Sequence, residues 1–186
     1  MKTVLKLLFV SASLLGFTQH SNAQPAVTVE TRNTVQTTPN KFTFEVYVKN
    51  TGTANWAYAT AQYGIKFNPD IINSGVLSVK ILASGLPDAQ KPPAALLSKS
   101  RDRIRITLNT ITEGGPWIKV GEEKLVARIE VTNTVNFPAV APNLTLRNKN
   151  PDRVLVSSYN SGNTGTAAAF ATVTLVNDTK QPQFHK

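Results

Sequence analysis

Apolar and polar residues alternate with a period of two along much of the chain. The pattern is clearest over residues 42–49, 103–108 and 124–132. Because successive side chains of a strand point to opposite sides, each stretch predicts a β-strand with one apolar and one polar face. Shorter matches bring the prediction to about nine strands, the others lying at residues 27–31, 59–67, 76–82, 144–147, 153–157 and 172–176.

Turn-forming residues separate these segments. Asn50–Gly52, Asn68–Asp70 and Asn148–Pro151 combine asparagine, aspartate, glycine and proline, which favour tight turns. A sustained helical period is missing from the sequence, and residues 94–98 suggest at most one turn of helix. Many short alternating strands with frequent turns are typical of an all-β fold, here predicted as a two-sheet β-sandwich of the jelly-roll type.

The first residues of the chain have the pattern of a secretory signal peptide. Lys2 and Lys6 precede a short apolar stretch, and Ser21-Asn22-Ala23 fits the small-x-small pattern of a cleavage site. The apolar stretch is too short and interrupted to predict a membrane span. We therefore expect a signal peptide at residues 1–23, a sandwich domain at 24–178, and a tail or the start of a linker at 179–186, in a secreted or cell-surface protein.

Composition excludes several kinds of chemistry. The chain has no cysteine, so disulfides, cysteine-ligated zinc and thiol catalysis are ruled out. Its formal net charge is +9, but the lysines and arginines are scattered and form no dense block. Scattered charge is typical of a solvated surface and does not indicate a nucleic-acid partner.

The sequence predicts neither an enzyme nor a cofactor. After the expected signal peptide the chain has one histidine, His185, close to its end, where a catalytic group is poorly positioned. No two carboxylates are marked as facing each other, and Glu45 and Glu130 fall on polar strand faces. The turns at residues 68–70 and 148–152 are rich in oxygen ligands, so a structural calcium ion is possible, although neither has the spacing of a dedicated calcium loop.

Aromatic residues near loops are candidate ligand contacts. Sugars stack on exposed aromatic rings, and the candidates are Trp56, Tyr58, Trp117 and Tyr159. A tryptophan at the edge of a loop either forms such a platform or closes one end of the sandwich, and both interpretations remain open. Tyr47 is expected on the polar face of its strand, in a row that is a further candidate contact surface.

Arginines form a second group of candidates. Arg103 and Arg105 share one strand face with Arg101 and could contact an acidic polysaccharide or the carboxylates of a protein partner. The alternative is that these charges discourage pairing between the edges of exposed strands.

The order of the segments resembles a known family. The motifs that carry the resemblance are Val48–Gly52, Ala59–Pro69, Gly75–Val79, Arg103–Thr110, Leu125–Val131 and Phe137–Leu144. Together they resemble the cohesin-like, carbohydrate-binding-module-like β-sandwich of secreted Bacteroidetes proteins, many of which end in a type IX secretion sorting domain that is not found in these residues.

Two functions follow as expectations. The loop aromatics favour a secreted, non-catalytic binding or adhesion module that recognises a glycan. The resemblance to cohesins implies the alternative, a protein–protein interaction or structural module of a larger cell-surface protein. The expected partner is accordingly a polysaccharide or a cell-surface protein.

Overall fold

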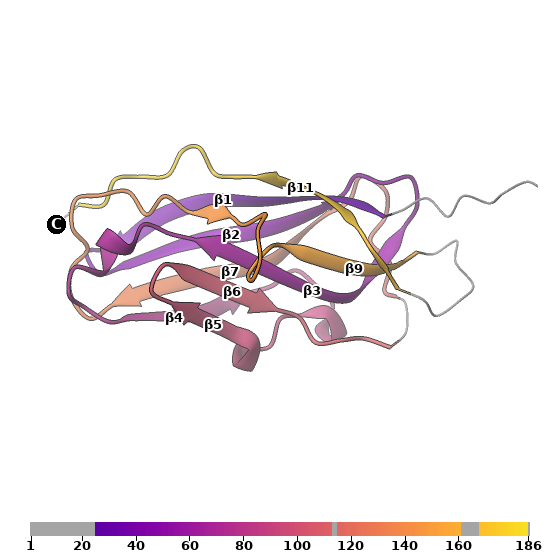
Figure 1. Ribbon diagram of the computed structural model, residues 1–186, viewed down its shortest axis with the longest axis horizontal. Helices are drawn as coiled ribbons and strands as arrows, with labels where there is room; N and C mark the ends of the chain where they lie inside the picture. The colour runs from indigo at the N-terminus through magenta and orange to yellow at the C-terminus, as the bar shows by residue number, and fades with distance from the viewer. Residues whose placement is uncertain (1–24, 113–114, 161–167, 186) are drawn as a thin grey trace, which may run out of the picture.

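Two β-sheets packed face to face make up the protein (Figure 1). The computed structural model describes residues 25–112, 115–160 and 168–185. One sheet has the strand order β11 (Thr172–Val176), β1 (Ala26–Thr38), β2 (Lys41–Asn50), β7 (Glu123–Asn133) and β4 (Leu77–Ala83). The other has the order β10 (Ala169–Phe170), β9 (Leu155–Asn160), β3 (Trp56–Lys66), β6 (Arg103–Thr107) and β5 (Leu97–Ser100), with β8 (Thr145–Leu146) also pairing with β3. We call them the five-stranded and the six-stranded sheet.

The predicted two-sheet β-sandwich is confirmed, with differences in its elements. Neither β5 nor β10 is among the predicted strands, and β1 continues to Thr38, past a register shift between Arg32 and Val35. The expected turn of helix at residues 94–98 is divided between the 3-10 helix η3 (Ala94–Leu96) and β5. Short edge strands are missed because too few of their side chains are buried to produce an alternating pattern. Two further 3-10 turns, η1 (Pro69–Ile72) and η2 (Asp88–Gln90), lie in loops.

The apolar sets of the alternating segments form the core. Phe42 and Phe44 on β2, Ile106 on β6, and Ile129 and Val131 on β7 are each 0% exposed. Burying a side chain of this size contributes about 1.5–3 kcal/mol to folding. The polar sets point outward, so each sheet has one outer face that is available for contacts.

The C-terminal segment differs from the tail expected at residues 179–186. Phe184 is 0% exposed, and its ring centroid lies 5.0 Å from that of Phe42 and 4.7 Å from that of Phe137. The side-chain amide of Gln181 donates to the carbonyl of Leu144 and accepts from its N–H. The chain is therefore anchored in the sandwich as far as Phe184. A single aromatic residue among polar ones has no periodicity, so the pattern could not reveal this anchor.

Two expectations concern the membrane and the signal peptide. The signal peptide expected at residues 1–23 lies outside the described residues. In the part of the chain that the structure describes, no helix has both the length and the apolar character needed to cross a membrane.

Candidate functional site

Two of the candidate aromatic residues belong to the core. Trp56 is 1% exposed and Tyr58 is 0% exposed, and their rings meet edge to face with centroids 5.0 Å apart. The hydroxyl of Tyr58 lies 2.6 Å from the hydroxyl of Tyr63, and burial raises the pKa of both phenols. The role of ligand platform considered for Trp56 and Tyr58 is incompatible with this burial, because a ring enclosed by protein offers no face to a sugar.

The other two aromatic candidates differ from each other. Tyr159 is nearly buried, and its hydroxyl donates to the carbonyl of Ile111 at 2.9 Å. Trp117 is 42% exposed on the loop before Ile118. Ile118 forms a two-bond backbone bridge with Trp56, and the amide of Gln90 donates to the Pro116 carbonyl. Trp117 is thus the exposed member of the four, on a well-anchored loop.

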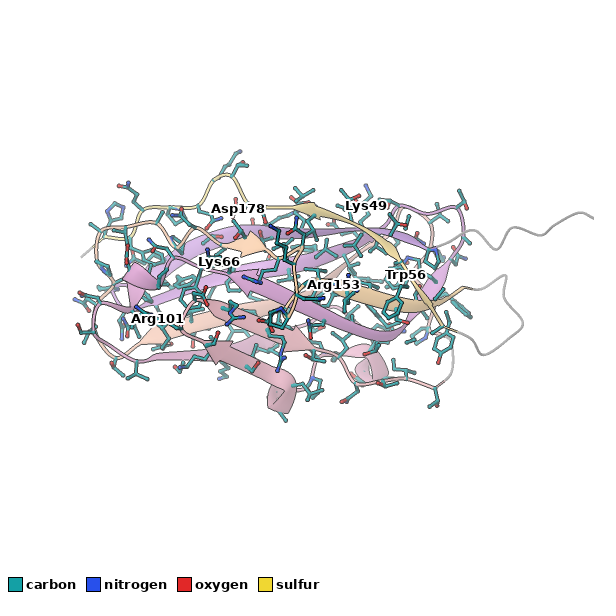
Figure 2. The ribbon with its side chains drawn as sticks, viewed as in Figure 1. Lys49, Trp56, Lys66, Arg101, Arg153 and Asp178 are labelled. Atoms are coloured by element: carbon teal, nitrogen blue, oxygen red, sulfur yellow. The ribbon has the colours of Figure 1, made fainter. Side chains whose placement is uncertain are left out.

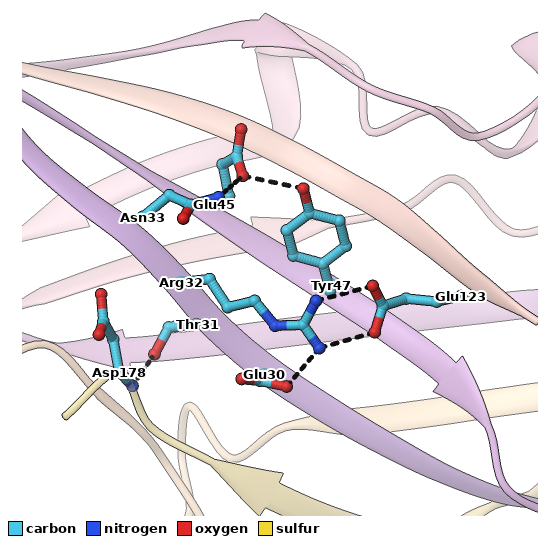
Figure 3. Close-up of polar contacts among 8 residues, drawn as sticks. All are labelled: Glu30, Thr31, Arg32, Asn33, Glu45, Tyr47, Glu123 and Asp178. Carbon is cyan, nitrogen blue, oxygen red and sulfur yellow. Dashed lines mark hydrogen bonds and ion pairs between the residues drawn. The ribbon is translucent and has the colours of Figure 1, made fainter. Parts of the chain in front are cut away.

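Ion pairs organise the outer face of the five-stranded sheet (Figure 3). The guanidinium of Arg32 donates to both carboxylate oxygens of Glu123 at 2.7 Å, and to Glu30 at 2.6 Å. The same guanidinium lies 4.8 Å from the ring centroid of Tyr47. The charge of Arg32 is therefore neutralised by Glu30 and Glu123, two carboxylates of the same sheet.

Glu45 is the centre of a second polar cluster on this face. We expect it to be solvated, yet it is 3% exposed and accepts hydrogen bonds from Asn33 at 2.6 Å, Tyr47 at 2.9 Å and Arg128 at 2.7 Å (Figure 3 draws the first two). Burial raises the pKa of the Glu45 carboxyl, but these donors outweigh that effect, so the pKa is lowered overall. The prediction of a solvated Glu45 was wrong, because the side chains of Asn33, Tyr47 and Arg128 enclose its carboxylate. The hydroxyl of Tyr47 is likewise used within the sheet, in its hydrogen bond to Glu45.

The outer face of the six-stranded sheet has a different balance of charge. The register places Ser98 opposite Arg105, Ser100 opposite Arg103, and Arg103 in turn opposite Lys66. Directly opposite residues point to the same side of a sheet, so these side chains share one face. In the view of Figure 2, Lys66 and Arg153 are drawn over β3 and β9 of this sheet. We use "cationic face" for the surface formed by Lys66, Arg103, Arg105 and Arg153.

Asp152 is the main acidic residue against this surface. Its carboxylate lies 2.6 Å from Nη1 of Arg103 and 3.6 Å from Nη1 of Arg105, and Asp102 contacts Nε of Arg103 at 3.0 Å. The loop that carries Asp152 lies on β3 at Gly64, which has no side chain to hold it off. A pocket of about 310 Å³ is lined by Ser98, Lys99, Ser100, Arg103, Arg105 and Asp152.

In the two turns considered for calcium, the side-chain oxygen atoms have other partners within the protein. Asp152 points its carboxylate at two guanidinium groups, which repel a divalent cation. In the other turn, the side-chain oxygen of Asn68 accepts from the N–H of Asp70 at 3.1 Å, as in an Asx turn. Within the described residues, no group of three or more acidic or histidine side chains is placed to hold a metal ion.

Sequence reasoning singled out Arg103 and Arg105, and the structure brings them together. The sequence did not single out Ser98 or Ser100, and Asp152 was considered only as part of the turn 148–152 weighed for calcium. Asp152 is 49 residues from Arg103 along the chain, and β5 has no alternating pattern, so no local signal connects these residues.

Solved structures of low sequence identity match this chain with TM-scores below 0.5. A type I cohesin from Pseudobacteroides cellulosolvens matches with a TM-score of 0.49 and 11% identity, over 87% of this chain and 97% of that one. A non-cellulosomal cohesin from Archaeoglobus fulgidus matches with a TM-score of 0.49 and 8% identity, over 87% and 92%. A biomass-sensing module of Clostridium thermocellum, described as resembling a family 3 carbohydrate-binding module, has a TM-score of 0.36 and 12% identity, over 81% and 98%.

No protein-family model matches the sequence, and no curated protein matches it either. The matches to cohesins and to a carbohydrate-binding-module-like domain have TM-scores below 0.5 and identities of 8–12%, values that say nothing about the ligand of this chain.

Proposed function

We propose that this protein is a non-catalytic binding module that recognises an acidic protein partner through its cationic face. The observation that carries the proposal is the direct opposition of Lys66 and Arg103 on neighbouring strands. Like charges placed opposite each other on a sheet repel. Asp102 and Asp152 offset the charge of Arg103, whereas Lys66 has no carboxylate of a described residue at ion-pair distance, so its charge is left for an acidic partner to offset.

The distribution of ion pairs supports the same surface. On the five-stranded sheet, Arg32 and Arg128 are neutralised by glutamates of that sheet. On the cationic face, Lys66 and Arg153 have no carboxylate of any described residue within ion-pair distance, and Arg105 has only the long contact with Asp152. Unpaired cations on a rigid sheet attract an acidic surface and raise the rate of association.

The proposed setting is extracellular. It rests on the signal-peptide pattern of residues 1–23, and the further assignment to Bacteroidetes proteins of type IX secretion rests on the resemblance of strand and turn motifs. In this setting the module would act in a larger assembly at the cell surface.

The test is a capture experiment with charge-reversed variants. The domain is immobilised and exposed to the secreted and surface fractions of the producing cells, and bound proteins are identified by mass spectrometry. A specific partner should bind the parent and fail to bind Lys66→Glu/Arg153→Glu. Lys80→Glu, on the edge strand β4 of the other sheet, is the control and should bind normally. Equal binding by all three proteins would contradict the proposed surface.

A second candidate function is glycan recognition, and the exposure of Trp117 is the observation that favours it. An indole presented by an anchored loop can stack on a sugar ring. Titration of polysaccharides against tryptophan emission, with Trp117→Phe as the control, tests it. A sugar that changes the emission of the parent and leaves that of Trp117→Phe unchanged would support this function.

A further inference from the structure

The carboxylate of Asp152 lies against Arg103 and Arg105 on the cationic face. We propose that Arg103 and Arg105 form a subsite for a partner's glutamate or aspartate side chain, and that Asp152 occupies this subsite until the partner displaces it. This inference rests on the proposed function and adds the chemical group recognised and the internal competitor for it.

The donors around the carboxylate form a compact array. Ser98 lies opposite Arg105 and Ser100 opposite Arg103, so two hydroxyls and two guanidinium groups belong to one patch of the same face. These residues line the pocket described above, together with Lys99. Guanidinium groups bind carboxylates through short, charge-assisted hydrogen bonds, and the 2.6 Å contact between Asp152 and Arg103 has this geometry.

The subsite is only partly satisfied by Asp152. The side chain of Arg105 is 46% exposed, and its contact with Asp152 is 3.6 Å, longer than a hydrogen bond. Arg103 is held more closely, by Asp152 and by Asp102. An incoming carboxylate can therefore engage Arg105 first and then replace Asp152 on Arg103.

The position of the loop does not depend on the Asp152 carboxylate. The side-chain amide of Gln62 donates to the Arg153 carbonyl at 3.0 Å, and the Val154 N–H donates to the Arg147 carbonyl at 2.7 Å. The backbone of the loop also lies close against β3 at Gly64. The carboxylate can thus leave the arginines while the loop keeps its place, which is what a displaceable internal ligand requires.

The test is the affinity of Asp152→Asn for poly-L-glutamate, a protein-like source of carboxylates, measured by calorimetry in low and physiological salt. We expect binding about three- to fivefold tighter than that of the parent, the upper part of the range measured for partly exposed ion pairs. Glu130→Gln is the matched control: it changes the net charge equally, but on β7 of the opposite sheet, and should bind within about twofold of the parent.

Two further measurements make the result specific. Arg105→Gln introduced into Asp152→Asn should abolish the gain, and thermal unfolding followed by circular dichroism checks that each variant is folded. Equal affinities of Asp152→Asn and Glu130→Gln would overturn the inference. A gain with polygalacturonate but not with poly-L-glutamate would also overturn it, by assigning the subsite to sugar carboxylates.

The proposed function can fail separately. If Lys66→Glu/Arg153→Glu binds the captured partner as the parent does, the cationic face is not the binding surface, whatever Asp152→Asn does. If that variant loses the partner while Asp152→Asn gains no affinity for poly-L-glutamate, the proposed function stands and the Asp152 inference is overturned.

Discussion

Gly64 on β3 lies directly beneath the backbone of Asp152. A Cβ atom built at Gly64 would stand 1.7 Å from the carbonyl oxygen of Asp152, far inside the contact distance of any two atoms. The absence of a side chain at this position is therefore what allows the loop to rest on the sheet and to bring Asp152 to the arginines.

Replacing Gly64 by alanine should displace this loop. Because the obstructing atom is backbone, we expect a loss of about 1–3 kcal/mol in the free energy of unfolding, measured by urea denaturation. Gly85→Ala is the control, since its Cβ would meet Leu125 at an ordinary 3.4 Å. A Gly64→Ala protein as stable as Gly85→Ala would contradict the close approach.

Replacing Phe184 by alanine should destabilise the whole sandwich. The ring is fully buried between Phe42 and Phe137, and removing a buried phenylalanine costs about 3–5 kcal/mol. Urea denaturation measures the effect, with Gln183→Ala at the exposed neighbouring position as the control. A loss below about 1 kcal/mol would show that the segment is dispensable.

The Glu45 cluster should make stability depend on pH in the acid range. The pKa of Glu45 is lowered in the folded protein, so its stabilisation is present above its unfolded pKa of about 4.3 and is lost as the pH falls through the folded value. Unfolding measured between about pH 6 and pH 3 should show this loss in the parent.

Variants identify the source of that pH dependence. Glu45→Gln should lose less stability on acidification, because the neutral amide does not titrate. Tyr47→Phe removes one of the donors to Glu45 and should give an intermediate result. Identical acid profiles for the parent and Glu45→Gln would contradict the assignment.

The two tryptophans should differ in their response to a soluble quencher. Trp117 is exposed and Trp56 is buried, so iodide should quench the emission of Trp56→Phe strongly and that of Trp117→Phe weakly. The emission maximum of Trp117→Phe should also lie at shorter wavelength, because its remaining indole is shielded from water. Equal quenching of the two variants would contradict their placement.

The sequence by itself determined the fold class and which residues of the long strands face inward. Alternation is a local property: Phe42, Phe44 and Val46 point into the core wherever β2 lies in the sheet. Arg103 and Arg105 could be placed on one outer face for the same reason.

The tertiary structure decided which residues meet. Asp152 and Arg103 are brought together by a loop that returns across β3, and Glu45 is enclosed by partners from β1 and β7. Trp56 and Phe184 are buried by elements far from them in the chain. Burial and charge pairing depend on which strands become neighbours, and a period of two contains no information about that.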